Sequence, residues 1–187
     1  MKTPLFIGID PGIKGAAGIV NFEQTFAKGY PFKMKSKGSQ LEQIKSYNTL
    51  SWLTEFILHN CDRPIVIAIE RVNPRPGQNV NGVFTFGKSL GAVYAALYPV
   101  CGLSNVSVSS IEPSAWQKEF KLVSGKEYEQ KKKDNRIKAI NTFADYDITV
   151  THQTADALLI AEFLRRNANQ SNLLFEGSKP ITLAHHE

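Results

Sequence analysis

Short apolar runs separated by polar and glycine-containing turns predict five β-strands in this chain. Two of them, Leu5–Asp10 and Ile65–Glu70, are apolar at almost every position, which is typical of strands covered on both faces. Two others, Ala16–Phe22 and Thr25–Lys33, are joined by a short turn and predict a β-hairpin. Val106–Ile111 is the fifth strand.

Apolar residues three and four positions apart predict the helices. This spacing indicates helices over Gln40–Asn60, Val83–Tyr98, Lys133–Phe143 and Thr154–Asn167. Pro113 is expected in the first turn of a short helix that carries Trp116 and Phe120. We expect the charged segment Ser124–Lys133 to be mobile and irregular. The order βββαβαβα, with a further helix at the end, predicts an α/β fold around one five-stranded mixed sheet flanked by helices.

Length and composition indicate one folded domain. The chain has 187 residues, 42% hydrophobic and 21% charged, which is enough for one sizeable core. We expect one folded domain over residues 1–168 and a tail over residues 169–187, where no periodicity is evident. No run approaches the ~20 apolar residues of a membrane span, and no signal-peptide pattern is present, so we expect a cytoplasmic protein. Cys61 and Cys101 lack metal-ligand spacing and are expected to be reduced structural thiols.

Three acidic residues lie on segments that otherwise form the core. Asp10 ends the first strand, Glu70 ends the fourth, and Asp156 opens the last helix. Strand alternation puts Gly8 on the face of Asp10 and Ala68 on the face of Glu70, so another element can pack closely over that face. A carboxylate at the edge of a buried element is costly unless it is protonated, paired or bound to a cation.

The spacing around Asp156 predicts that it faces the sheet. Leu159, Ile160 and Phe163 lie three, four and seven residues beyond it, so all four share the buried side of the helix. His152 lies four residues before Asp156. It falls on the same side if the helix extends back that far, and otherwise lies at the helix N-terminus beside Asp156.

Together, these residues would form an oxygen-rich site with one nitrogen ligand. Such a site suits Mg²⁺ or Mn²⁺ rather than structural zinc. Two divalent ions held by carboxylates are suited to phosphodiester cleavage, because one activates water and the other stabilises the leaving oxygen. The simpler alternative is that Asp156 is a helix cap and that Asp10 and Glu70 are exposed strand ends.

The net charge of +5 is concentrated in clusters. Eight basic residues against four acidic ones lie between Lys118 and Lys138, and Lys28, Lys33, Lys35 and Lys37 form a second cluster. Basic stripes of this kind are typical of proteins that bind a phosphate backbone, although a solvated lysine-rich surface has the same composition. The candidate DNA contacts are Lys14, Arg71, Arg75, Lys88, Lys118, Lys121, Lys126, Lys131, Lys132 and Lys133.

Several motifs, in order along the chain, resemble those of one enzyme family. They are Ile7–Gly12 with Gly15, Ile67–Glu70, Phe86–Gly91, Ile111–Lys118 and Ala155–Ala161. In this order they are similar to the motifs of RuvC-type Holliday junction resolvases, which belong to the ribonuclease H-like superfamily. The resemblance covers about residues 5 to 167. An Asp-Pro-Gly sequence alone is weak, whereas the ordered set of acidic motifs is specific.

The resemblance implies a ribonuclease H-like fold and a homodimeric endonuclease that cuts four-way DNA junctions symmetrically, leaving 5′-phosphate ends. It implies two Mg²⁺ ions per active site, with Mn²⁺ as a possible substitute. By position, Asp10, Glu70 and Asp156 would be metal ligands, and Lys118 would contact phosphate or stabilise charge in the transition state. His152 is the fourth candidate ligand and catalytic residue.

The sequence departs from the family pattern at two places. Many members carry a fourth carboxylate three or four residues before the last, whereas this chain has His152 and Gln153 there. The bacterial enzymes place an aromatic residue three positions after the glutamate, where this chain has Asn73. Phe84 or Phe86 could replace it, although we expect both in the core. The long loop between Pro74 and Gly82 is more similar to the phage or viral branch of the family.

Other functions are compatible with the same residues. A nuclease for flaps, Y-junctions or branched DNA in general would have the same catalytic site. A non-catalytic DNA-binding module would gain nothing from carboxylates that face phosphates. An actin-like or sugar-kinase ATPase needs two such domains, so we do not expect one from these 187 residues.

Two symmetric cuts require two active sites, so we expect a homodimer. The predicted interface is the helix Val83–Tyr98, through Phe84, Leu90, Val93, Tyr94 and Leu97. Gly87 and Gly91 on the same helix would let a neighbouring backbone come close.

Overall fold

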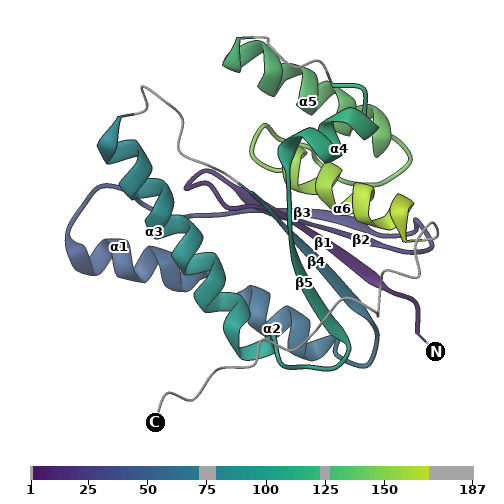
Figure 1. Ribbon diagram of the computed structural model, residues 1–187, viewed down its shortest axis with the longest axis horizontal. Helices are drawn as coiled ribbons and strands as arrows, with labels where there is room; N and C mark the ends of the chain where they lie inside the picture. Colours follow the sequence, from purple (N-terminus) through teal and green to yellow (C-terminus); the bar gives the residue numbers. More distant parts are fainter. Residues whose placement is uncertain (1, 72–78, 123–126, 169–187) are drawn as a thin grey trace.

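The computed structural model of the chain describes residues 2–71, 79–122 and 127–168. Its centre is a five-stranded sheet with the strand order β3-β2-β1-β4-β5 (Figure 1). The strands are β1 (Leu5–Asp10), β2 (Ala16–Asn21), β3 (Ala27–Pro31), β4 (Ile65–Glu70) and β5 (Val106–Ile111). β1 pairs antiparallel with β2 and parallel with β4, and β5 is parallel to β4. The expected mixed sheet is confirmed.

The two most apolar strands lie side by side in the middle of the sheet. Every residue of β1 and β4 is buried except the last one of each, Asp10 and Glu70. Because the register pairs Ile9 with Ile69, the two carboxylates follow at the same edge of the sheet. Parallel pairing of two apolar strands therefore brings together residues that are far apart in sequence.

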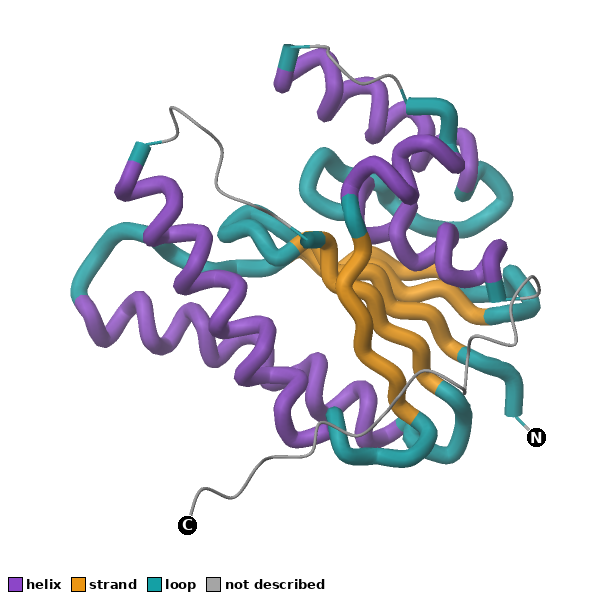
Figure 2. Tube along the Cα trace, in the orientation of Figure 1, coloured by secondary structure: helices purple, strands orange, loops and turns teal. Residues whose placement is uncertain are grey.

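Helices cover both faces of the sheet, as Figures 1 and 2 show. One face carries α1 (Gln40–Tyr47), α2 (Ser51–His59) and α3 (Val80–Leu97), with the short 3₁₀ turns η1 (Asn48–Leu50) and η2 (Tyr98–Val100). The other face carries α4 (Pro113–Glu119), α5 (Tyr128–Thr142) and α6 (Ala155–Asn167). None of the helices in the described ranges is both long and apolar enough to serve as a membrane span.

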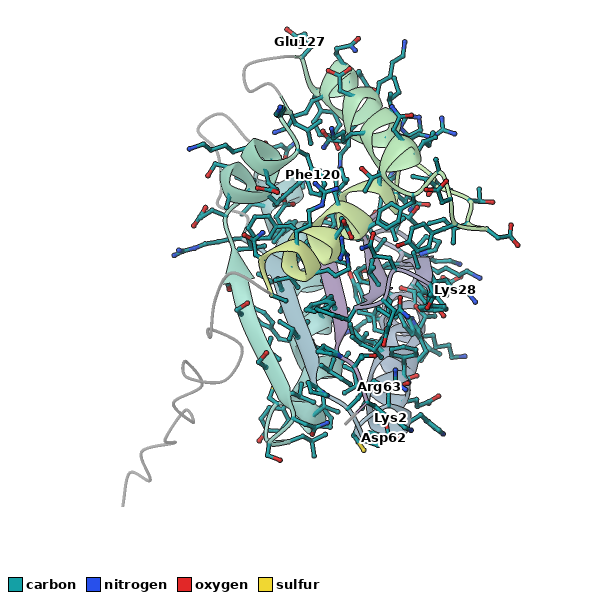
Figure 3. The ribbon with its side chains drawn as sticks, turned by 90° about the vertical axis from the view of Figure 1, so that its right-hand side faces the viewer. Lys2, Lys28, Asp62, Arg63, Phe120 and Glu127 are labelled. Atoms are coloured by element: carbon teal, nitrogen blue, oxygen red, sulfur yellow. The ribbon has the colours of Figure 1, made fainter. Side chains whose placement is uncertain are left out.

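Strand alternation divides the buried side chains into two cores. Ile7 and Ile67 pack with Leu53, Val93 and other residues of the α1–α3 layer. The opposite core lies around α6, and its large side chains include Trp116, Phe120, Phe143, Leu158, Leu159 and Ile160. In the view of Figure 3, Glu127 before α5 lies at one end of the molecule and the ion-paired Lys2 and Asp62 lie at the other.

Several expected element boundaries were wrong. The helix expected over Gln40–Asn60 is two helices separated by η1, where Asn48 and Thr49 favour a turn over regular helix. β3 ends at Pro31, which lacks a backbone N–H for further pairing. α3 begins at Val80 rather than Val83, because the Asn79 side chain accepts a hydrogen bond from the Asn81 backbone N–H.

The segment expected to be irregular up to Lys133 is helical from Tyr128. Its glutamate, glutamine and lysine residues are good helix formers, so charge alone was a poor guide to irregular structure. Cys61 and Cys101 are free, as expected, but both are exposed and contribute nothing to the core. Lys126, Asn73, Arg75 and the tail 169–187 lie outside the described residues.

Candidate active site

Three carboxylates from separate elements meet at one edge of the sheet. Asp10 and Glu70 end adjacent strands, and Asp156 lies in the first turn of α6. α6 lies directly against β1 and β2 because Gly8 and Gly18 have no side chains. A Cβ atom added at Gly18 would lie 2.5 Å from the backbone oxygen of Ala157. The close packing that the small residues predicted is confirmed, and it brings Asp156 to the strand ends.

Asp156 is held by two side chains of α5. Lys132 Nζ donates to Asp156 Oδ2 at 2.6 Å, and Asn135 Nδ2 donates to Asp156 Oδ1 at 2.8 Å. The same Lys132 Nζ lies 3.7 Å from Asp10 Oδ2. Asp156 is only 5% exposed, and Lys132 is its charged partner. A single ammonium group therefore connects the carboxylates of β1 and α6.

The turn after β1 fixes the carboxylate of Asp10. The backbone N–H of Gly12 donates to Asp10 Oδ1 at 3.1 Å, and the N–H of Gly15 closes the turn onto the Gly12 carbonyl. Ser89 Oγ in α3 donates to the carbonyl of Pro11 at 2.7 Å. The Asp-Pro-Gly turn is thus attached to α3, on the other face of the sheet.

Glu70 has a different partner, the indole of Trp116 in α4. Trp116 Nε1 donates to Glu70 Oε1 at 3.1 Å, and the ring is fully buried. A buried indole N–H needs an acceptor, so this bond satisfies Trp116 and orients Glu70 at the same time.

The crowding of three carboxylates shifts their proton affinities. Burial, followed by the negative charges of Asp10 and Asp156, raises the pKa of Glu70 to about 7. Burial also raises the pKa of Asp10, with the charge of Lys132 opposing the shift and that of Asp156 adding to it. Burial favours the neutral form of Lys132, but the charges of Asp156 and Asp10 outweigh it and raise the pKa of that ammonium. The site has more negative charge than its own cation neutralises.

The donor set fits a hard divalent cation. Asp10, Glu70 and Asp156 offer carboxylate oxygens, the ligands that Mg²⁺ and Mn²⁺ prefer. Asn135 Oδ1 is buried beside Asp156 and finds no hydrogen-bond donor among the described residues, so an acceptor is available for a hydrated ion. The carboxylates of this site are arranged around Lys132. Within the described ranges, no three His, Cys, Asp or Glu side chains are positioned to hold a metal ion. The metal ligands therefore stay a prediction.

His152 precedes α6 and is exposed. Its side chain lines a depression together with Lys133, Arg136 and other residues of α5. The neighbouring Gln153 donates to the carbonyl of Lys14 at 3.4 Å, so the turn after β1 lies beside the start of α6. No bond joins His152 to the three carboxylates in the part of the chain that is described, and its role as a ligand stays a prediction.

The basic residues proposed for DNA binding occupy several elements. Lys14, Lys118, Lys121 and Lys133 are exposed, and Lys131 is half-buried. Lys118 lies in the last turn of α4. Two more have partners: Arg71 pairs with Glu112 at 3.1 Å, and the Lys88 ammonium lies 4.6 Å from the Phe84 ring centroid.

Lys132 was predicted to be a DNA contact, whereas Asn135 and Trp116 were not predicted to be site residues. Lys132 and Asn135 are three residues apart and share the inner face of α5. The shared face could not be predicted, because the helix was expected to begin only at Lys133. The contact of Trp116 could have been predicted from its position. A buried indole N–H so soon after β5 requires a hydrogen-bond acceptor near the strand end.

The sequence matches no family model and no curated protein. Its fold is similar to that of solved structures. Thermus thermophilus RuvC in complex with a Holliday junction substrate is 20% identical, with a TM-score of 0.60 over 89% of this chain and 96% of that chain. A T. thermophilus RuvC structure gives a TM-score of 0.56 at 20% identity over the same shares. The yeast mitochondrial Holliday junction resolvase Ydc2 gives 0.49 at 18% identity, over 88% and 78%. The chain therefore has a RuvC-like fold.

Proposed function

We propose that this protein is a metal-dependent endonuclease that resolves four-way DNA junctions. The observation that carries the proposal is the meeting of Asp10, Glu70 and Asp156 around Lys132 at one edge of the sheet. The fold supports it, because T. thermophilus RuvC has a similar fold and was solved with a Holliday junction substrate. A purely structural use of three crowded carboxylates would raise the free energy of the folded state without benefit.

Each residue has a distinct part in this proposal. Asp10, Glu70 and Asp156 would hold two Mg²⁺ or Mn²⁺ ions, which supply an activated water and neutralise charge on the phosphate when bound. Asn135 and Trp116 orient the carboxylates that they contact. Lys132 provides positive charge between Asp10 and Asp156, where the scissile phosphate would approach.

Basic residues around the carboxylates would bind the DNA backbone. Lys14 lies in the turn beside α6, and Lys118 and Lys121 lie at the end of α4. We keep Lys118 as a candidate for phosphate contact or transition-state charge. Because these contacts replace counterions on the DNA, affinity for the junction should fall as salt concentration rises.

We further propose that the enzyme is a homodimer joined through α3. Phe84 is 64% exposed, and Tyr98, the first residue of η2 directly after α3, is 76% exposed. Gly87, Gly91 and Tyr94 lie between them on the same exposed side. Together these five residues form what we call the α3 stripe. The core position expected for Phe84 was therefore wrong.

The interface predicted from sequence needs a correction. Val93 and Leu97 are buried in the core of the same chain, and Leu90 packs against that core. They face the sheet because the helix turns them to the side opposite Phe84 and Tyr94. The α3 stripe is the exposed part of the predicted interface, and two symmetric cuts require two active sites.

Two alternatives differ in substrate or in chemistry. A nuclease for flaps and Y-junctions would use the same carboxylates. A non-catalytic DNA-binding module would bind junctions without cutting them. The crowding of carboxylates favours an enzyme, because negative groups at a DNA-binding surface weaken binding unless they hold cations.

A cleavage panel tests the proposal. Wild type and Asp10→Asn are incubated with labelled four-way, Y-shaped and linear duplex DNA, with Mg²⁺ and Mn²⁺ compared. We expect paired symmetric nicks in the four-way junction, ends that ligate directly, and a loss of at least about 1,000-fold in rate for Asp10→Asn. Equal cutting of the Y-junction would favour the debranching enzyme. Binding without any cleavage by wild type would favour the non-catalytic module.

A further inference from the structure

The helix α5 has a second face that the proposed catalytic site does not use. On its inner face, Lys132 and Asn135 contact Asp156. Its outer face borders a depression of about 400 Å³, whose opposite wall includes His152. The α5 residues that line it include Ile137 and Ile140.

Two isoleucines of α5 give this depression an apolar part. Ile137 is 48% exposed and Ile140 is 43% exposed. Both lie on the outer side of α5, whereas the inner side packs through the buried Ala139. Neither isoleucine is needed for the core, so their exposed surface is available to a ligand.

Cationic side chains flank the isoleucines. Lys133 and Arg136 both line the depression. Arg136 Nε donates to the carbonyl of Val150 at 3.3 Å, which fixes the guanidinium group beside the apolar surface. Lys133 is exposed. The lining also includes Glu129 and Gln130, one acidic and one neutral side chain, so the formal charge stays positive.

We propose that this depression, the α5 outer site, binds one unpaired nucleotide of the DNA strand that lies across the catalytic site. The imidazole of His152 and the isoleucine side chains would contact the base, and Lys133 and Arg136 would contact the phosphate. Stacking on a ring next to cationic side chains is a general mode of binding single-stranded nucleic acid. This inference rests on the proposed function, since it supplies a second contact for the same substrate.

The location supports a nucleotide from the same strand. Lys133 follows Lys132 directly, and Lys132 contacts the carboxylates. His152 lies four residues before Asp156 in the chain. The α5 outer site is therefore connected to the catalytic site through both of its walls, and it gives His152 a role away from the metal ions.

The test measures binding without cleavage. Fluorescence anisotropy in EDTA is used with two probes, a labelled four-way junction and a labelled oligothymidine strand, both with Asp10→Asn protein. We expect His152→Ala and the double variant Ile137→Ala/Ile140→Ala to weaken binding of both probes about 5-fold or more. Lys133→Ala should lower the slope of log K against log salt by about 1. EDTA removes any contribution of His152 as a metal ligand.

Controls come from α1, on the other face of the sheet. Ile44 is 50% exposed and Lys45 is exposed, so Ile44→Ala and Lys45→Ala remove the same chemical groups elsewhere. Both should bind the probes as the parent does. Thermal unfolding followed by circular dichroism checks that each variant is folded.

The outcomes separate this inference from the proposed function. If the His152 and isoleucine variants bind both probes like the parent while wild type cuts junctions, the α5 outer site is refuted and the proposed function stands. If wild type cuts nothing but the variants lose affinity for the oligothymidine strand, the site stands and the nuclease proposal fails. Equal losses in the α1 controls would also refute the site, because the effect would then be non-specific.

Discussion

Helices α6 and α3 lie on opposite faces of the sheet and use glycine for opposite purposes. Under α6, a Cβ atom added at Gly18 would meet backbone atoms of Ala157 and Leu158 at 2.5 Å. On α3, Cβ atoms added at Gly87 and Gly91 would meet nothing within 4 Å. Glycine in the strands permits a close contact within the chain, whereas glycine on α3 leaves a surface that no other described element covers.

Charged groups follow the same division. Asp156 of α6 is buried and has two partners from α5. Lys88 of α3 lies over the ring of Phe84, which is itself largely exposed. Substitutions on the α6 side should therefore change the folding free energy strongly, and matched substitutions on α3 should change it little.

The largest effect is expected from Gly18→Ala. The new methyl group would overlap backbone atoms of α6, which cannot rotate out of the way as a side chain can. We expect the free energy of unfolding to fall by more than about 3 kcal/mol, or the protein not to fold. Urea denaturation followed by circular dichroism measures the change. A loss below about 1 kcal/mol would show that α6 can move away from the sheet without much penalty.

Glu70→Gln tests the crowding of the carboxylates through pH. With a folded pKa of about 7 against an ordinary value of 4.5, folded Glu70 keeps a proton that the unfolded chain releases between these pH values. The stability of wild type should therefore fall as pH rises from 4.5 to 7 and remain low above pH 7.

In EDTA, Glu70→Gln should be more stable than wild type by roughly 2–3 kcal/mol at pH 8, and the difference should vanish near pH 4.5. Denaturant titrations at several pH values measure this difference. Glu55→Gln, at an exposed position of α2, is the control for the loss of one carboxylate elsewhere in the chain. A difference that stays constant with pH would contradict the raised pKa.

Lys132→Met compares a paired lysine with its exposed counterpart on α3. Removing the ammonium leaves Asp10 and Asp156 without their shared cation. In EDTA at neutral pH we expect a loss of about 2 kcal/mol, less than for a fully buried pair because Lys132 is partly exposed. Lys88→Met should change the free energy of unfolding by less than about 0.5 kcal/mol. If Lys132→Met and Lys88→Met lowered the free energy of unfolding equally, the expected difference between the α6 side and α3 would be wrong.

The fold and the positions of the three carboxylates could be predicted because each of them depends on the residue pattern of a single segment. The apolar runs of β1 and β4 end at Asp10 and Glu70, and the buried side of α6 includes Asp156. The helical period and the strand alternation of apolar residues are properties of a single segment. They can therefore be recognised without knowing which segments contact one another in the fold.

The hydrogen-bond partners of the carboxylates could not be predicted from the pattern of a single segment. Lys132 and Asn135 contact Asp156 because α5 packs beside α6, and no local pattern specifies that packing. The direction of His152 depends on where α6 begins, and a shift of one residue turns a side chain by about 100° around a helix. The exposed side of Phe84 was missed because an aromatic residue at helical spacing has the same pattern inside and outside a core.

A small effect, opposite in sign to that of Gly18→Ala, is expected from Gly91→Ala. The substitution is chemically the same as Gly18→Ala, but here the methyl group meets no described atom within 4 Å beyond the nearby backbone of its own helix. Because alanine is the better helix former, the free energy of unfolding of the monomer should rise by about 0.5–1 kcal/mol. Denaturation at low protein concentration measures this gain. If the α3 stripe pairs with a second copy, the gain should shrink at high protein concentration, where the methyl group separates the two helices. A loss of stability at every concentration would mean that the stripe is already packed within one chain.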